Sequence, residues 1–471
     1  MRKHSSNVAA ITGIAMLAAI SVLFAAASNS EASTALRQVQ SSAVPALRAV
    51  KPSVFTQATP RSPIFRLEEP GTKYNDNSGA IYRTQFRLTK FTRNGRLVRS
   101  FGRRGTTRTI KVGRAGENWD YRAVPLRDGR VAVYGGLGGV DEPSVINLGY
   151  SITMFRSNGK IDRRFADGGQ LVVRYPHSKS RKGAFSADTA VPLGRSGIAL
   201  CGTIFHTEFG LRVGAIRVFR KDGQPEPGFG NGGTITLDGA FVGNRFGTSA
   251  CYAAQGGSSI VGAFGSFRTE TPMTFNDSDN QLIRVTSRGN LDRNFGTGGR
   301  TIFPRLSFGK GSFSGEVFSM TSDRNGRFLV HNHMYDPDVD SFAVLYRMNK
   351  NGTVDTSFSR DGVAKLPQFA NVVAPQADGS VLIGGEATAR KKHGSKYETY
   401  VAPTMMSVNE NGTSDRRWGR RGYKIFKNYN DPIEQFITVR GRQYFVGPAR
   451  YRKGGTRYPG PRLPFFYATG R

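Results

Sequence analysis

Short apolar runs alternate with glycine-containing polar turns along most of the chain. The clearest example is Val372 to Gly385, VVAPQADGSVLIGG, in which two apolar runs flank Asp378-Gly379. Two apolar runs joined by Asp-Gly are typical of a β-hairpin. Related stretches run from Ala123 to Gly136 and from Ala190 to Gly202, and looser ones start at Cys251, Phe318 and Phe436. No stretch has sustained helical periodicity, so the pattern predicts an all-β protein.

A second pattern, here called the repeat phrase, occurs six times. Its clearest copy is Leu282 to Gly299, LIRVTSRGNLDRNFGTGG. Each copy has a turn glycine where a positive φ is expected. These glycines, 60 to 66 residues apart, are Gly95, Gly159, Gly223, Gly289, Gly352 and Gly412. A period of this length indicates a repeat architecture.

Each period supplies about four short strands. In the fifth copy, one strand runs from about Phe342 to Met348, and another is expected from Val363 to Leu366 after the turns. Four-stranded units repeated around an axis are blades of a β-propeller. Six inner hairpins predict six blades, with the N-terminal side supplying the outer strand of the last blade. Seven blades and a right-handed β-solenoid are the alternatives.

The two patterns together resemble the delta-60 repeat family, over about residues 82 to 447. Leu282 to Gly299 and Val372 to Gly385 carry the resemblance most clearly. It implies a propeller-like fold and an exported or surface-exposed bacterial protein, and it transfers no catalytic residue. Three copies depart from the pattern, and we expect looser turns there. The departures are Val98 in place of Asp, Pro225-Glu226-Pro227 in place of the Leu-Asp step, and Trp418 in place of Phe.

The N-terminal segment predicts export. Arg2, Lys3 and His4 precede an apolar run from Val8 to Ala27, and small residues offer cleavage sites after Ala27 or Ala32. Residues 1–32 are therefore a signal peptide or, because the run is long enough to span a bilayer, an uncleaved anchor. Residues 33–80 are expected to form a loosely ordered leader, and 81–471 the propeller. The predicted location is secreted or on the cell surface.

The charge of the chain points to polyanions. The 471 residues carry 67 Lys and Arg against 34 Asp and Glu, a formal net charge of +33. Such an excess attracts nucleic acid, acidic glycans or cell-wall polymers, although it also serves solubility alone. Basic clusters with tyrosines nearby are the candidate contact residues. They are Lys179, Arg181, Lys182, Arg390, Lys391, Lys392, Arg420 and Arg421.

One stretch outside the repeats suggests a metal site. Alternation along a strand places His331 and His333 on one face, and Asp336 and Asp338 follow within reach. Nitrogen and oxygen ligands of this kind suit a divalent ion. The alternative, which we favour, is a histidine pair beside a solvated acidic loop. The aspartate of each phrase is expected to cap its own turn, and the phrase aromatic to pack between blades.

The chain has two cysteines, Cys201 and Cys251. They lie at similar distances from the turns of two successive hairpins, so they are expected at similar height on neighbouring blades. Export places them in an oxidising compartment. A disulfide between these blades and a pair of buried free thiols are the two alternatives.

The sequence therefore predicts an exported binding or scaffold module, monomeric, without a cofactor, whose partner is an anionic polymer or cell-wall component. A membrane contact is expected only through an uncleaved N-terminal segment. There are two rivals. One is a propeller-fold hydrolase or lyase with its site at the central channel, and the other is a purely structural surface protein.

Overall fold

A computed structural model gives the fold of the chain. Residues 1–53, which include the predicted export signal and part of the leader, lie outside the described residues. The described residues are 54–55, 64–68, 73–75, 80–82, 84–92, 96–114, 118–138, 149–175, 183–205, 212–242, 250–254, 257–267, 278–308, 311–313, 316–334, 342–366, 369–393, 396–417, 422–425, 435–439, 442–449 and 463–468. No helix in this part of the chain is long and apolar enough to cross a membrane.

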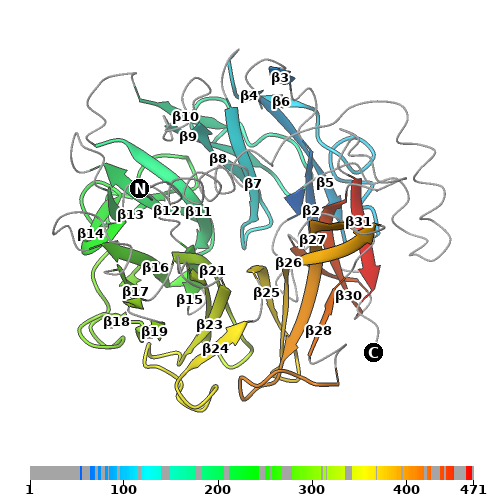
Figure 1. Cartoon of the computed structure of the whole chain (residues 1–471). Helices are drawn as coiled ribbons and strands as arrows, with labels where there is room; N and C mark the ends of the chain where they lie inside the picture. The colour runs from blue at the N-terminus through cyan, green and yellow to red at the C-terminus, as the bar shows by residue number, and fades with distance from the viewer. Residues whose placement is uncertain are drawn as a thin grey trace, which may run out of the picture.

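The chain is an all-β propeller with six four-stranded sheets, which confirms the predicted fold class (Figure 1). In spatial order the sheets are β1 (Val54–Phe55), β2 (Ile64–Glu68), β5 (Gln85–Phe91), β6 (Ile110–Lys111); β10 (Gln170–Arg174), β9 (Gly149–Phe155), β8 (Val131–Gly138), β7 (Asn118–Pro125); β11 (Phe185–Leu193), β12 (Gly197–Phe205), β13 (Arg212–Phe219), β14 (Thr234–Val242); β15 (Ala250–Ala254), β16 (Ser259–Phe267), β17 (Ser278–Thr286), β18 (Arg300–Ile302); β21 (Glu316–Ser322), β22 (Phe328–Met334), β23 (Phe342–Met348), β24 (Val363–Leu366); and β25 (Phe369–Pro375), β26 (Val381–His393), β27 (Lys396–Val408), β28 (Tyr423–Ile425).

Three smaller sheets accompany the blades. A three-stranded sheet of β29 (Gln435–Val439), β30 (Arg442–Ala449) and β31 (Leu463–Ala468) follows the last four-stranded blade, and its β29 lies against β25. Two hairpins complete the described strands: β3 (Lys73–Asn75) with β4 (Ala80–Tyr82), and β19 (Leu306–Phe308) with β20 (Gly311–Phe313).

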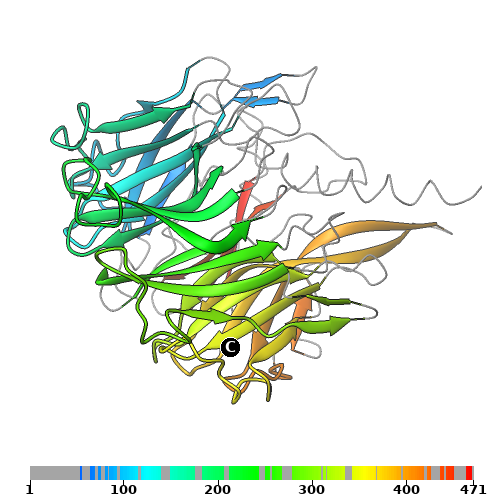
Figure 2. The same cartoon turned by 90° about the vertical axis from the view of Figure 1, so that its left-hand side faces the viewer.

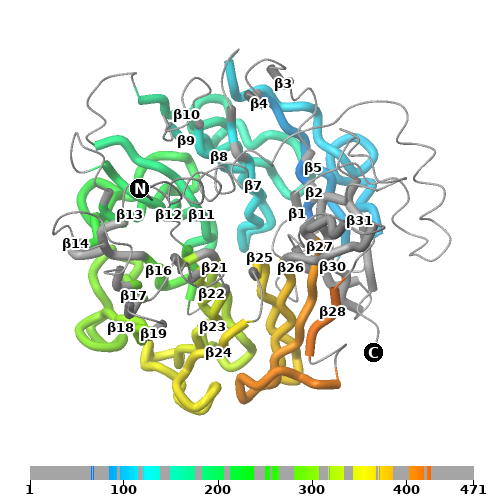
Figure 3. Tube along the Cα trace, in the orientation of Figure 1, coloured from blue at the N-terminus to red at the C-terminus, as the bar shows by residue number. Residues whose placement is uncertain are grey.

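The five four-stranded blades from β7 to β28 follow the order of the predicted elements. The inner hairpins become strand pairs such as β7–β8 and β25–β26, and β7, β11, β15, β21 and β25 lie around the centre in Figure 1. All neighbouring strands are antiparallel, so the hairpin turn and the phrase turn lie at the same end of each blade. The chain passes through the blades in sequence order (Figure 3). The β26–β27 pair extends beyond the other strands (Figure 2).

The beginning of the propeller differs from the prediction in two ways. The predicted leader contains β1 and β2, and Phe65 and Leu67 of β2 are buried. The N-terminal side was expected to supply the outer strand of the last blade, but β5 and β6 form a separate sheet with β2. Alternating apolar residues in Ile64–Glu68 supply the partner that β5 needs, so β29–β31 remains a three-stranded sheet among the described residues.

The core lies between the blades. Phe165 of one blade packs in a cluster with Phe185, Ile198 and Phe219 of the next. The phrase phenylalanines are fully buried at all five described positions, as predicted: Phe101, Phe165, Phe229, Phe295 and Phe358. Trp418 lies outside the described residues. Burying a phenylalanine contributes about 1.5–3 kcal/mol, so each ring stabilises one junction between blades.

The two cysteines form a disulfide that joins β12 to β15, with their Cα atoms 6.2 Å apart. Cys201 and Cys251 both belong to the apolar cluster between these blades. This pairing realises the disulfide alternative of the sequence analysis. Thiol titration of unfolded, unreduced protein should find no free thiol, and reduction beforehand should release two per chain. Two free thiols without reduction would contradict the pairing.

Candidate anion-binding face

The repeat phrases connect neighbouring blades through one recurring backbone hydrogen bond. The N–H after each phrase phenylalanine donates to the carbonyl that precedes the next phrase's turn glycine. The bonds are Gly102 N to Asn158 O (2.7 Å), Ala166 N to Asp222 O (2.7 Å), Gly230 N to Arg288 O (2.9 Å), Gly296 N to Asn351 O (2.7 Å) and Ser359 N to Asn411 O (2.8 Å). Because each bond joins consecutive copies, the six phrases form one arc on a single face. We call this arc, from turn glycine to closing glycine in each copy, the phrase face.

The turn glycine allows this close approach between blades. Gly289 has a φ of +82°, and a Cβ there would lie 2.7 Å from Gly230 N of the preceding phrase. Gly159, Gly223 and Gly412 have positive φ as well and equally close backbone neighbours. A side chain at these positions would be strained and would also push the preceding blade away.

The phrase acids stabilise the turns from inside. The carboxylate of Asp292 accepts from Asn294 N (3.2 Å), Asp355 from Ser357 N (3.1 Å) and Asp415 from Arg417 N (3.2 Å). These bonds confirm the predicted turn-capping role for three of the aspartates, whereas Asp162 accepts from the side chain of Arg164 (3.1 Å). At two of the departing copies, where looser turns were expected, one backbone hydrogen bond of the phrase is the same as in the other copies. Val98 and Glu226 make the same backbone bonds, Val98 N to Lys90 O and Glu226 N to Val218 O (both 2.9 Å), because the backbone carries the turn.

Arginines from inside the blades neutralise these acids. Arg347 Nε lies 2.7 Å from Asp355 Oδ2, and Arg284 Nε lies 2.8 Å from Asp292 Oδ2. Each guanidinium also stacks on the phrase phenylalanine, 4.4 Å from the Phe358 centroid for Arg347 and 4.7 Å from that of Phe295 for Arg284. Cation–π contacts of this kind are stabilising where water is excluded.

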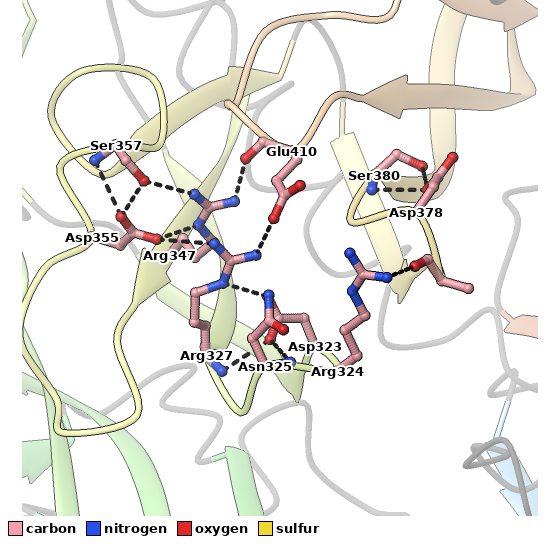
Figure 4. A network of polar contacts seen from close by, with 11 residues as sticks. Asp323, Arg324, Asn325, Arg327, Arg347, Asp355, Ser357, Asp378, Ser380 and Glu410 are labelled. Carbon is pink, nitrogen blue, oxygen red and sulfur yellow. Dashed lines mark hydrogen bonds and ion pairs between the residues drawn. The ribbon is translucent and has the colours of Figure 1, made fainter.

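Figure 4 shows this arrangement at the junction between the β21–β24 and β25–β28 blades. Arg347 donates through Nη1 to the carbonyl of Glu410, while Arg327 Nη2 lies 3.0 Å from the Glu410 carboxylate. Arg327 also pairs with Asp323 at 2.6 Å. Burial alone would raise the pKa of Asp355, but hydrogen bonds from Ser357 and the charge of Arg347 lower it below its ordinary value. The charged groups of this network therefore serve the structure of the junction between the two blades.

The outer surface of the phrase face is strongly basic. The fourth residue after the turn glycine is exposed in every copy, and four of the six are arginine: Arg99, Arg163, Arg293 and Arg416, with Pro227 and Thr356 in the others. The described part of the phrase face has eleven exposed cations: Arg96, Arg99, Arg103, Arg104, Lys160, Arg163, Arg164, Arg293, Arg360, Arg416 and Arg417. Its exposed acids are Asp167 and Asp361. The phrase aspartates would balance this positive charge, but they lie on the inner side of the turns.

Few of the predicted polyanion-binding residues can be compared with this surface. Lys179, Arg181, Lys182, Arg420 and Arg421 lie outside the described residues. Arg390, Lys391 and Lys392 were expected in a connecting loop but belong to β26, where they pair with Thr399, Glu398 and Tyr397 of β27. The apolar pattern of this hairpin ends at Gly385, so the strand predicted from the sequence was shorter than β26.

The predicted metal ligands are described only in part. His331 and His333 lie on one face of β22 as predicted, with ring centroids 4.9 Å apart. His333 Nε2 lies 2.6 Å from Ala370 O of the next blade, and His331 Nδ1 lies 3.5 Å from Ser319 Oγ. Asp336 and Asp338 lie outside the described residues. Among the residues that the structure describes, no three His, Cys, Asp or Glu side chains form a group that could hold a metal ion.

The histidine pair should make stability depend on pH. Burial and the neighbouring His333 hold the pKa of His331 well below its ordinary value, so the folded chain resists a proton that the unfolded chain accepts near pH 6.5. Stability is therefore full above pH 6.5 and falls as pH drops below it. We expect His331→Asn to reduce the slope of unfolding free energy between pH 7 and 5 by up to about 1.4 kcal/mol per pH unit. Chemical denaturation at several pH values measures this slope. An unchanged slope in the variant would show that His331 does not cause the pH dependence of stability.

The described side chains of the innermost strands include one carboxylate, that of Asp188 in β11. It lies at an irregularity in the β11–β12 register, and its backbone carbonyl accepts from Arg122 Nη1 at 3.2 Å. Asp120 and Glu316 also lie on innermost strands, but their side chains are outside the described set. Glycoside hydrolysis usually requires a pair of carboxylates.

Comparison with known proteins finds similarity at the level of fold. No family model and no curated protein matches the chain. Among solved structures, it is similar to a protein of unknown function from Dyadobacter fermentans, with 10% identity, a TM-score of 0.38 and coverage of 89% of this chain and 98% of that one. An α-L-arabinofuranosidase from Fusarium graminearum has 9% identity and a TM-score of 0.37, covering 75% and 93%. Acylaminoacyl peptidase from Pyrococcus horikoshii has 11% identity and a TM-score of 0.39, covering 89% and 50%. These similarities assign no activity to any residue of this chain.

Proposed function

We propose that the protein is an exported binding module that holds an anionic polymer on its phrase face. One observation carries the proposal: consecutive turns, bonded into a single arc, present eleven exposed cations and two exposed acids among their described residues. Export rests on the N-terminal sequence, and the resemblance to delta-60 repeats agrees with it. The polymer would be a cell-wall polymer, a nucleic acid or an acidic glycan.

The geometry suits a polymer better than a small anion. Each exposed arginine on its own interacts weakly, because water and salt screen its charge over about 8 Å at physiological ionic strength. A polymer contacts several arginines at once and releases its condensed counterions, so the small contributions add up. Rigid spacing also reduces the entropy lost on binding, since the turns are held by backbone bonds.

Binding to heparin, polyphosphate and DNA at several salt concentrations tests the proposal. The triple variant Arg163→Gln, Arg293→Gln, Arg416→Gln should bind more weakly and show a salt slope smaller by up to about three, roughly one for each lost contact. These side chains are exposed, so folding should be unaffected. The matched variant with lysine at the same three positions keeps the charge and should retain most of the affinity.

Three other results would each overturn part of this proposal. Loss of binding in a variant with Arg390, Lys391 and Lys392 changed to Gln, but not in the phrase variant, would move the site to the β26–β27 hairpin. Release of shorter products from a polymer would favour the hydrolase or lyase. No salt-sensitive binding to any of the three polymers would favour a purely structural protein.

A further inference from the structure

A second basic site lies between the β7–β10 and β11–β14 blades. Arg217 of β13 donates through Nη1 to the hydroxyls of Tyr150 (3.2 Å) and Tyr175 (2.9 Å). Its guanidinium lies 4.8 Å from the Phe185 ring centroid and 5.7 Å from that of Tyr150. Tyr150 is the second residue of β9 and Tyr175 directly follows β10, so the cluster lies toward the blade end opposite the phrase turns.

Arg217 differs from four other shielded arginines in having no acid beside it. Arg130, Arg284, Arg327 and Arg347 each have a carboxylate oxygen within 2.8 Å of Nε. Among the described residues Arg217 has none, and its Nε is shielded from solvent without an acceptor. Shielding a charge without a counter-charge is costly, so the site is suited to an anion from outside.

The polar groups of the cluster that are left for a ligand are all hydrogen-bond donors. Each tyrosine oxygen accepts from Arg217, so each hydroxyl hydrogen is left to donate, together with the N–H groups of Nη2. Burial raises the pKa of Tyr150, so this hydroxyl stays protonated at neutral pH and does not serve as the missing negative charge. Several donors beside a guanidinium charge match the chemistry of an oxyanion.

The repeat itself does not require this cluster. At the position six residues before the turn glycine, the other copies have Thr89, Thr153, Ile283, Tyr346 and Met406 where this one has Arg217. At the position nine before it, the place of Tyr150, they have Phe86, Gly214, Asn280, Ala343 and Pro403. Arg217 and Tyr175 are each partly exposed, so the cluster can be reached from solvent.

We propose that Arg217, Tyr150 and Tyr175 bind a single oxyanion group, a carboxylate, sulfate or phosphate, at a site separate from the phrase face. Arg217 supplies the charge, and the two hydroxyls orient the group. The site is independent of polymer binding, because it shares no residue with the phrase face.

Isothermal titration of the full chain with sulfate, phosphate and acetate tests this proposal. Ionic strength is held constant, so that screening at the phrase face does not change. We expect saturable one-site binding near the millimolar range for at least one anion, at least tenfold weaker in Arg217→Met and several-fold weaker in Tyr175→Phe. Arg195→Met, in the turn between β11 and β12, should bind like the unchanged chain.

The three anions distinguish the group, since acetate stands for a carboxylate and the others for sulfate and phosphate. Thermal unfolding of each variant without anion checks folding, and Tyr175→Phe covers the case in which Arg217→Met fails to fold. Equal affinity in Tyr175→Phe and the unchanged chain, or no saturable binding of any of the three anions, would overturn the site. Either result would leave the salt dependence of polymer binding untouched.

Discussion

Replacing Gly289 by valine should destabilise the protein by about 2–6 kcal/mol. A β-branched residue at a φ of +82° costs about 1–3 kcal/mol in backbone strain. Its Cβ would also lie 2.7 Å from Gly230 N and 2.9 Å from the Ile235 side chain, and overpacking of this kind adds about 1–3 kcal/mol. The bond from Gly230 N to Arg288 O would be lost with it. Chemical denaturation measures the change.

Gly298 provides the matched control in the same copy of the phrase. Its φ is +63°, and no atom lies within 4 Å of the place that a Cβ would occupy there. Gly298→Val should therefore show the backbone strain alone, about 1–3 kcal/mol. If the two variants are equally stable, the turn glycine does not mediate the contact between blades.

Replacing Arg347 by methionine should cost about 3–5 kcal/mol. The change leaves the buried carboxylate of Asp355 without its nearest cation and removes the bond to the carbonyl of Glu410. Breaking a buried pair by removing one partner is far more damaging than its net contribution suggests, because a buried charge remains. Urea denaturation gives the free energy, and Asp355→Asn in the same background should recover part of the loss.

Arg417 is the exposed counterpart of Arg347. It pairs with Asp415 at 2.9 Å, but its side chain is 81% exposed. Water screens this pair, so Arg417→Met should change stability little. A loss as large as that of Arg347→Met would show that burial does not set the strength of these pairs.

Much of the fold could be predicted from the sequence, because local pattern and local structure agree. Val363–Leu366 is a strand with the predicted bounds, and Gly159, Gly223, Gly289, Gly352 and Gly412 have the positive φ that their turns require. The start of the propeller was harder to predict. The short apolar segment Ile64–Glu68 has no turn motif of the repeat, and it became a strand through its pairing with β5.

The candidate sites depended on distant contacts that one sequence does not reveal. The bonds that join consecutive phrases connect residues more than 50 positions apart, so the shared face of the arginines could not be derived from clusters along the chain. A signal was nevertheless present, because aligning the six copies places arginine at the same exposed position in four of them. Arg217 gave no such signal, since its partners Tyr150 and Tyr175 belong to a different repeat.

Modification of arginines by a dicarbonyl reagent, with and without heparin, tests the central proposal most directly. Mass spectrometry then reports the protection of each arginine separately. We expect heparin to slow modification of Arg163, Arg293 and Arg416 several-fold and to leave Arg114 unchanged. Arg114 is exposed and follows β6 at the opposite end of its blade, where the neighbouring Gly113 N donates to Thr84 O ahead of β5. Equal protection of Arg114 and the three phrase arginines, or protection of none of them, would contradict polymer binding at the phrase face.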